Sequence, residues 1–355
     1  MLDHEAMSSF DVAFVVPLQG PAGIFGPSAE LCAELAADEI NRAGGVLGRE
    51  LRLVPVDGGA APQAVAAEVA GLVDAGAVHG VTGWHISTVR QAVAPRIAGR
   101  VPYVYTALYE GGERAEGVYL TSETPDVQLF PAMTLLAGER SARHWYIVGN
   151  DYVWPRRTAR AARRHAIADG MTVAGESYVP LGTHDFTAVL RRVERSGADA
   201  VLMLLVGTDA VRFNRAFGRS GLAARCLRLS TLMDENMLLA SGASATHDLF
   251  STAGFFASMV TPENLDFHGR YASRFGHEAP PLGSLGESCH EGVLLLAALI
   301  GQAGSSDLRA IAANAESVSY EGPRGLLRLR QRHVNQRIYL AKARGVEFDV
   351  LTQLP

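Results

Sequence analysis

Residues 82–111, TGWHISTVRQAVAPRIAGRVPYVYTALYEG, decide the fold of this chain. A Gly-aromatic-polar-Ser turn leads into a short helix that contains a proline, and an apolar strand then runs into a second polar and aromatic turn. Side chains with hydroxyl, imidazole, indole and phenol groups therefore follow two successive strands. In an open α/β sheet, small ligands bind at the carboxyl ends of the strands. A site made of these groups, without a formal charge, suits a small polar and uncharged ligand.

Strand and helix patterns alternate on both sides of this stretch. In the first part we expect strands at 11–17, 51–56, 78–82, 103–105 and 118–120, and helices at 28–41, 62–75 and 88–97. After residue 121 we expect helices at 128–139, 156–169, 186–196 and 211–220, and strands at 144–148, 172–178, 200–205 and 227–230. A last section that begins near residue 252 holds helices at 264–275 and 289–303. This is the βαβ rhythm of parallel doubly wound sheets.

The chain of 355 residues is long for a single hydrophobic core. We expect an α/β protein with two Rossmann-like lobes, parallel-sheet cores and a ligand cleft between them. About three crossover strands would join the lobes, near residues 121–125, 252–260 and 322–330. Each lobe is then discontinuous: residues 11–121 and 253–325 form the N-terminal lobe, and residues 122–252 and 326–355 form the C-terminal lobe.

The composition is that of a globular protein, with 48% hydrophobic and 19% charged residues. The formal net charge of −5 gives no basic footprint, so we expect no direct binding of nucleic acid. The cysteines form no CxxC motif and lie far apart, which favours free buried thiols at Cys32, Cys226 and Cys289.

The start of the chain is acidic, and its apolar run at residues 12–18 is too short for a secretory signal. No apolar run reaches membrane-spanning length, so we expect no membrane insertion. These features favour a cytoplasmic protein. A periplasmic or extracellular protein is the alternative if a signal peptide has been removed.

Motifs for cofactors and catalysis are weak. Gly20, Gly23 and Gly26 do not form G-x-G-x-x-G and are interrupted by prolines, so we expect a mobile loop at the mouth of the cleft. The eleven histidines show no metal-ligand spacing, and neither cofactor nor metal is expected. Ser87 lies two residues from His85, but without a G-x-S-x-G elbow we expect a helix N-cap that receives a ligand carbonyl rather than an enzyme.

Four short stretches resemble one family: GWHIS (83–87), YTALYEG (105–111), VGNDYVWPR (148–156) and VGT (206–208). Residues 41–49, NRAGGVLGR, are similar to its opening signature. The family is that of type I periplasmic binding proteins. Within it the chain looks most like the amide-sensing regulators of aliphatic amidase expression and the related urea and short-chain amide receptors of ABC transporters. The resemblance covers residues 11–345.

The resemblance implies a ligand site with Ser87 as the binding serine and Tyr105 and Tyr152 as cleft tyrosines. The full expected site combines Trp84, His85, Ser87, Tyr105, Thr106, Ala107, Tyr152, Trp154, Val206 and Thr208. The amide-sensing regulators have tyrosine at the positions of His85 and Trp154, and Thr-Pro where Ala107-Leu108 stand here. The pocket is therefore expected to be bulkier and less hydroxylated, to suit a larger or more apolar amide, and to bind with an affinity that His85 makes pH-dependent.

Two functions follow from this resemblance. In the first, the protein is a cytoplasmic sensor whose open or closed state is read by an RNA-binding antitermination factor. In the second, it is a receptor that delivers amides, urea or branched-chain amino acids to an ABC permease. An α-amino-acid ligand would need an acidic partner for its ammonium group, for which Asp209 or Asp234 are candidates. Association into a homodimer stays open.

Overall fold

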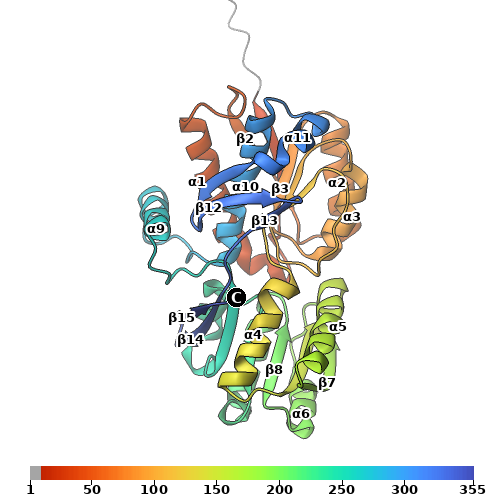
Figure 1. The fold of residues 1–355 in the computed structure, drawn as a ribbon, viewed down its shortest axis with the longest axis vertical. Helices are drawn as coiled ribbons and strands as arrows, with labels where there is room; N and C mark the ends of the chain where they lie inside the picture. Colours follow the sequence, from red (N-terminus) through yellow and green to blue (C-terminus); the bar gives the residue numbers. More distant parts are fainter. Residues whose placement is uncertain (1–8) are drawn as a thin grey trace, which may run out of the picture.

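The computed structural model describes residues 9–355 and shows two α/β lobes, one above the other in Figure 1. Each lobe has a sheet of mostly parallel strands with helices packed on it, as the alternating pattern predicted. The acidic residues 1–8, which entered the expectation about cellular compartment, lie outside the described residues. Within the described part, none of the helices is both long and apolar enough to span a bilayer.

The first lobe contains an eight-stranded sheet in the order β11-β12-β13-β5-β4-β3-β1-β2. Its parallel strands are β1 (Phe10–Val16), β2 (Leu51–Asp57), β3 (Gly80–Gly83), β4 (Tyr103–Tyr105) and β5 (Val118–Leu120). The later strands are β11 (Ser319–Gly322), β12 (Gly325–Arg330) and β13 (His333–Asn335). The helices of this part are α1 (Gly26–Arg42), α2 (Pro62–Asp74), α3 (Ser87–Ile97), α9 (Pro262–Phe275), α10 (Ser284–Ala303) and α11 (Leu308–Asn314).

The second lobe contains a seven-stranded sheet in the order β15-β14-β10-β9-β8-β6-β7. Its parallel strands are β6 (His144–Asn150), β7 (Thr172–Val179), β8 (Ala200–Leu204), β9 (Leu227–Ser230) and β10 (Leu249–Ala253). The hairpin of β14 (Tyr339–Arg344) and β15 (Glu347–Gln353) is antiparallel to β10. The helices are α4 (Pro125–Glu139), α5 (Val153–Ala168), α6 (Thr187–Ser196), α7 (Thr208–Arg219) and α8 (Glu235–Ser241).

The chain passes between the lobes after β5, after β10 and after β13. The third passage differs from the expected one at 322–330, because β12 and β13 pair within the first sheet. Gly322 pairs with Gly325, so the Gly-Pro-Arg-Gly segment is a two-residue hairpin turn rather than a crossover. Residues 326–335 therefore lie in the first lobe, and the passage falls between Asn335 and Tyr339.

The buried character of the parallel strands explains why the sequence pattern identified them. All five residues of β8 are buried, as in a strand covered by helices on both faces. Cys32, Cys226 and Cys289 are buried free thiols, which confirms the prediction made from their spacing.

The lobes contact each other across the cleft. The loop at 19–27 was expected to be mobile, but it contains a 3₁₀ turn, η1 (Pro21–Phe25), that packs against α7 and α8 of the second lobe. Gly207, at the start of α7, lies so close that a Cβ atom there would overlap the carbonyl oxygen of Pro21. Asn236 of α8 donates a hydrogen bond from Nδ2 to the carbonyl of Pro281, at 3.0 Å.

Candidate functional site

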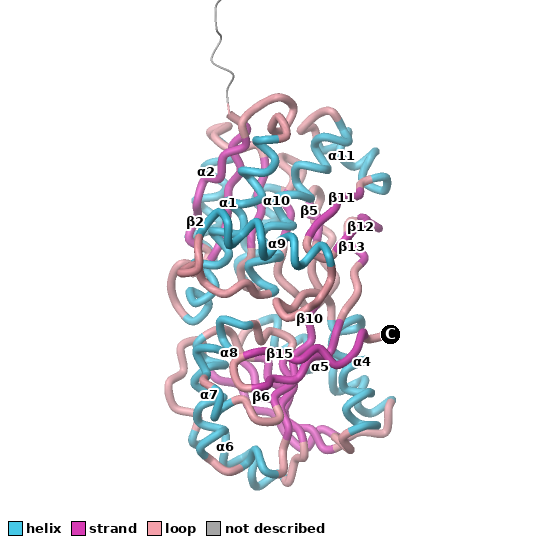
Figure 2. Tube along the Cα trace, turned by 90° about the vertical axis from the view of Figure 1, so that its left-hand side faces the viewer, coloured by secondary structure: helices cyan, strands magenta, loops and turns pink. Residues whose placement is uncertain are grey.

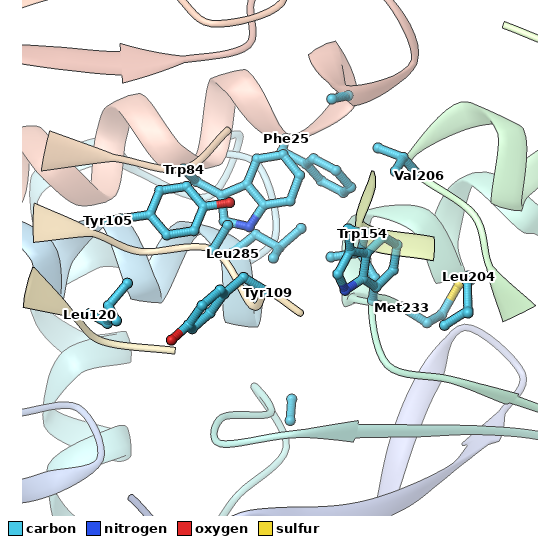
Figure 3. Packing of buried hydrophobic residues seen from close by; sticks show 14 of the residues in the cluster. Phe25, Trp84, Tyr105, Tyr109, Leu120, Trp154, Leu204, Val206, Met233 and Leu285 are labelled. Carbon is cyan, nitrogen blue, oxygen red and sulfur yellow. The ribbon is translucent and has the colours of Figure 1, made fainter. Parts of the chain in front are cut away.

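The candidate ligand cleft lies at the carboxyl ends of four parallel strands, β3 and β4 of the first lobe and β6 and β8 of the second. Figure 3 shows Trp84, Tyr105 and Tyr109 on one side and Trp154, Val206 and Met233 on the other. Parallel strands of one sheet end at the same edge, so each lobe presents its loops to the other.

A buried carboxylate is the centre of the polar groups in the cleft. The side chain of Glu110 has no exposed surface. Its Oε2 atom accepts a hydrogen bond from the Ser87 hydroxyl at 2.7 Å. Its Oε1 atom accepts from Arg90 Nη2 at 2.8 Å and from Gln91 Nε2 at 3.0 Å. Sequence reasoning missed Glu110 as a site residue, although it stands in the Tyr-Glu-Gly stretch that carried the resemblance.

Two tyrosines, one from each lobe, join this carboxylate. The Tyr105 hydroxyl donates to the backbone carbonyl of His85 at 2.7 Å, and burial raises its pKa. The pKa of Tyr152 is raised by burial and then by the proximity of Tyr105 and Glu110, which belong to the other lobe. The structure therefore brings together the predicted Ser87, Tyr105 and Tyr152 around Glu110.

Aromatic and aliphatic side chains enclose these polar groups. Trp84 is 2% exposed and meets Phe25 edge to face, with ring centroids 4.9 Å apart. Trp154 and Val206 are buried on the opposite side. The indole Nε1 of Trp84 is buried and has no hydrogen-bond partner among the described residues.

His85 is a structural residue rather than a cleft residue. Its Nδ1 atom lies 3.1 Å from the carbonyl oxygen of Val15, and its Nε2 atom lies 2.5 Å from the Tyr103 hydroxyl. Burial lowers its pKa to about 4. The structure therefore does not support the expectation that His85 contacts the ligand and titrates near neutral pH.

Ser87 differs from its expected role as a helix cap. Ile86 is the N-cap of α3, and Ser87 is the first helical residue, with its hydroxyl turned to Glu110. Because both ring nitrogens of His85 face other partners, the Ser-His pair that motivated an enzyme hypothesis is not formed. Ser87 still stands at a helix start, where backbone N–H groups lack intrahelical partners.

The remaining predicted residues divide between the cleft and the interior. Thr106 is buried and turns its hydroxyl to Ser288 of α10 at 3.4 Å, and Ala107 is also buried. Thr208 begins α7, directly after the Gly207 contact with the first lobe. Phe25, Arg90 and Met233 were missed because their positions depend on how helices and loops pack.

The acidic residues considered for an ammonium partner are engaged elsewhere. Asp209 Oδ2 accepts hydrogen bonds from the Asn150 amide and from the backbone of Gly182, both at 2.8 Å. Asp234 caps α8 by accepting from Met237 N at 3.0 Å. Among residues 9–355, no group of His, Cys, Asp and Glu side chains is arranged to hold a metal ion.

The charges of the cleft are balanced. The Arg90 guanidinium pairs with Glu110 and, through Nε, with Glu113 at 2.9 Å. Arg157 of α5 approaches Glu110 from the second lobe at 3.9 Å. The expectation of a site without formal charges was wrong, but two carboxylates face two guanidinium groups, and the cleft is close to neutral as a whole.

Comparison with known proteins agrees with the architecture. The sequence pattern of the family described as "Periplasmic binding protein" matches residues 9–347. A Leu/Ile/Val-binding protein homolog 6 from Brucella melitensis is 25% identical over 274 residues, covering 73% of this chain and 68% of the relative.

Solved structures of solute-binding proteins have the same two-lobed fold. The solute binding protein of an ABC transporter from Rhodopseudomonas palustris HaA2, in complex with p-hydroxybenzoic acid, has a TM-score of 0.86 and 23% identity, with 98% of each chain covered. The branched-chain amino acid transporter substrate binding protein LivJ from Streptococcus pneumoniae, in complex with isoleucine, has a TM-score of 0.84 and 18% identity, covering 98% of this chain and 99% of the other. With two lobes, a cleft between them and a family match over nearly the whole described length, this chain belongs to the type I periplasmic binding proteins.

Proposed function

We propose that this protein is the solute receptor of an ABC importer and that its lobes enclose a small, neutral, amide-like or urea-like solute. The observation that carries the proposal is the buried Ser87–Glu110 hydrogen bond of the first lobe, together with the half-buried Tyr152 of the second lobe, whose pKa is raised by burial and in part by Glu110. The relatives named above are solute-binding proteins, which supports the receptor role.

The Ser87–Glu110 pair offers complementary partners for an amide. Amides and ureas carry a carbonyl acceptor and N–H donors on adjacent atoms. The Glu110 carboxylate accepts N–H donors, while the Ser87 hydroxyl and the first N–H groups of α3 donate to a carbonyl. Because Ser87 and Glu110 are hydrogen-bonded to each other, a ligand that inserts between them replaces one polar contact with two.

The balance of charge favours a neutral ligand over an acid. The positive charge of Arg90 is already paired with two carboxylates, and Arg157 also faces Glu110, so a carboxylate ligand would compete with the cleft's own carboxylates for these cations. The acids in the names of the structural neighbours belong to proteins less than 25% identical to this one, so the ligand class has to be inferred from this chain's own cleft.

Closure of the lobes completes the site. Tyr152 and Trp154 come from the second lobe, whereas Ser87, Tyr105 and Glu110 come from the first. A solute that touches both lobes stabilises their contact in proportion to its preference for the closed form. Trp84, Phe25 and Trp154 exclude water from the enclosed solute, which strengthens its hydrogen bonds.

The first experiment is thermal unfolding of the full chain with acetamide, propionamide, urea, isoleucine or 4-hydroxybenzoate. A solute at a hundred times its dissociation constant adds about 2.7 kcal/mol of stability, and we expect this from an amide or urea. Ser87→Ala should abolish the shift, whereas Ser273→Ala, on the exposed surface of α9, should keep it. A shift with the two acids alone would refute the ligand class, and no shift with any compound would refute the cleft assignment.

An amide sensor read by an antitermination protein is the second candidate. The observation that favours it is that the Tyr-Glu-Gly and Asp-Tyr-x-aromatic-Pro-Arg stretches both reach the cleft, through Glu110 and Tyr152. A deletion strain separates the two functions. Loss of labelled amide uptake, with the protein outside the cytoplasm on fractionation, supports the receptor. Loss of amide control over amidase expression, with a cytoplasmic protein, supports the sensor.

A further inference from the structure

A second groove lies at the boundary of the lobes, lined by different residues from the cleft. It has a volume of ≈ 420 Å³. We call it the boundary groove; its principal lining residues are Glu235, Leu239 and Val346 of the second lobe and His268, Tyr271 and Pro281 of the first-lobe side. In Figure 2, α8 lies at the upper edge of the second lobe, with α9 on the lobe above it.

Two side chains of the boundary groove are held by the same residue. Ala257 N donates to Glu235 Oε1 at 2.7 Å, and the imidazole of His268 is hydrogen-bonded to the backbone of Ala257. The other polar atom of each side chain, Glu235 Oε2 and His268 Nε2, is buried and has no hydrogen-bond partner among the described residues. Glu235 is only 8% exposed. Both side chains line the same groove, and native proteins normally avoid buried polar atoms without partners.

The charges around these atoms are of one sign. The carboxyls of Asp234 and Glu235 both face Gly283, where a Cβ atom would meet Asp234 Oδ2 at 2.8 Å and Glu235 Oε2 at 3.0 Å. The other titratable groups of the groove are His268, Tyr271, His277 and Glu347. None of the described residues that line the groove is Arg or Lys. A charged carboxylate at Glu235 would need a cation, and the groove supplies none from its own walls.

We propose that the boundary groove binds a small primary amine with an apolar body, whose ammonium group donates to Glu235 Oε2 and His268 Nε2. An ammonium group has three N–H donors and no acceptor, so one such group satisfies both atoms. An alcohol has a single donor, and a carboxylate has no donor for either atom. The apolar body packs on Leu239, Tyr271 and Leu282.

Binding of an amine is expected to change the protonation state of Glu235, which a binding experiment can detect. Burial, followed by the neighbouring Asp234, raises the pKa of Glu235 to about 8, so this carboxyl is mostly protonated at pH 7. The pKa of His268 is lowered by burial, which keeps its ring neutral. An ammonium group beside Glu235 favours the charged carboxylate, and its binding therefore releases a proton from Glu235.

Isothermal titration calorimetry of the full chain tests the inference, with benzylamine as the probe and benzyl alcohol as its uncharged counterpart. At pH 7 we expect benzylamine to bind at one site and benzyl alcohol to bind at least tenfold more weakly. The benzylamine heat should differ between phosphate and Tris buffers because of proton release. Glu235→Gln keeps an oxygen for Ala257 N but removes the charge, and should weaken benzylamine binding tenfold or more and abolish the buffer difference.

Two controls locate the site. Glu278→Gln removes an exposed carboxylate from the same loop region and should leave benzylamine affinity unchanged. Ser87→Ala alters the cleft and should also leave it unchanged, so the result is independent of the proposed amide function. Equal binding of the two probes, unchanged binding by Glu235→Gln, or loss of binding in Ser87→Ala would each overturn the proposal.

Discussion

His85 is surrounded by the first lobe and binds at both ring nitrogens, to the Val15 carbonyl and the Tyr103 hydroxyl. Burial lowers its pKa from 6.5 to about 4, so the folded protein keeps the ring neutral. The unfolded chain takes up a proton below pH 6.5, whereas the folded chain does so only near pH 4. This contribution to stability is therefore complete above pH 6.5 and is lost as the pH falls towards 4.

We predict that lowering the pH from 7 to 5 reduces the free energy of unfolding by about 2 kcal/mol through His85 alone. Chemical denaturation at both pH values measures the change. His85→Gln should lose this part of the pH dependence, although its stability at pH 7 will also be lower. His184→Gln, on an exposed loop, should retain the wild-type dependence. An unchanged pH profile in His85→Gln would show that other groups cause the acid sensitivity.

Among the structural elements, the β11–β12 hairpin has a buried charge at its turn. Its Arg324 forms ion pairs with Glu287, at 3.3 Å, and Glu291 of α10. The guanidinium also lies 3.5 Å from the carbonyl oxygen of Thr121, on the first passage between the lobes. Its Nη1 atom would be 2.6 Å from a Cβ atom at Gly254, on the second passage. One side chain thus links a helix of the first lobe to two of the crossovers.

We predict that Arg324→Met lowers the free energy of unfolding by about 3–5 kcal/mol, because it leaves the carboxylate of Glu291 buried without its cation. Arg328→Met, on the exposed face of the same hairpin, should change it by less than about 0.5 kcal/mol. Urea denaturation of both variants compares them directly. Equal changes in the free energy of unfolding would mean that the buried ion pairs of Arg324 contribute no more to stability than the exposed Arg328 does.

At the same scale, the sequence predicted the parallel strands other than β10, and it predicted none of the elements that follow α10. The strands at 118–120 and 227–230 have the expected bounds because buried apolar runs have few alternatives. Most strands between Ser319 and Gln353 are short or largely exposed, and β13 and β14 also pair with β5 and β10, which are far away in the sequence.

The candidate site was predictable to the extent that it follows strand ends. Tyr105 is the last residue of β4, and Ser87 and Tyr152 lie in the segments that follow β3 and β6. The topology therefore brings them together, and their contact with a ligand stays a prediction. Glu110 was not predictable, because its role depends on the distance to Arg90 on another element.

In the molecule as a whole, Gly207 sets how closely the lobes approach. Its φ of 52° lies in the left-handed region that favours glycine, and the position of a Cβ atom is already occupied by the Pro21 carbonyl. The two lobes meet at this point through backbone atoms alone. Any side chain would hold them apart at the mouth of the cleft.

We predict that Gly207→Ala remains folded but gives a larger radius of gyration in small-angle X-ray scattering and binds the cleft ligand tenfold or more weakly. Gly221→Ala is the matched control, since Gly221 has a φ of 77° and no atom within 4 Å of its Cβ position. Both variants carry similar backbone strain, and only the first has the collision with Pro21. Identical scattering and affinity in the two variants would show that this contact does not limit closure.

The discontinuous lobes have a consequence for synthesis on the ribosome. β13 pairs beside β5, and β14 pairs beside β10, so both sheets are completed by strands that are made after α10. A nascent chain that has not reached Asn335 leaves one edge of its first sheet unpaired. The second sheet is complete only when β15, which ends at Gln353, has been made. Unpaired strand edges are aggregation-prone. Termination of synthesis before Asn335 would therefore damage both lobes at once.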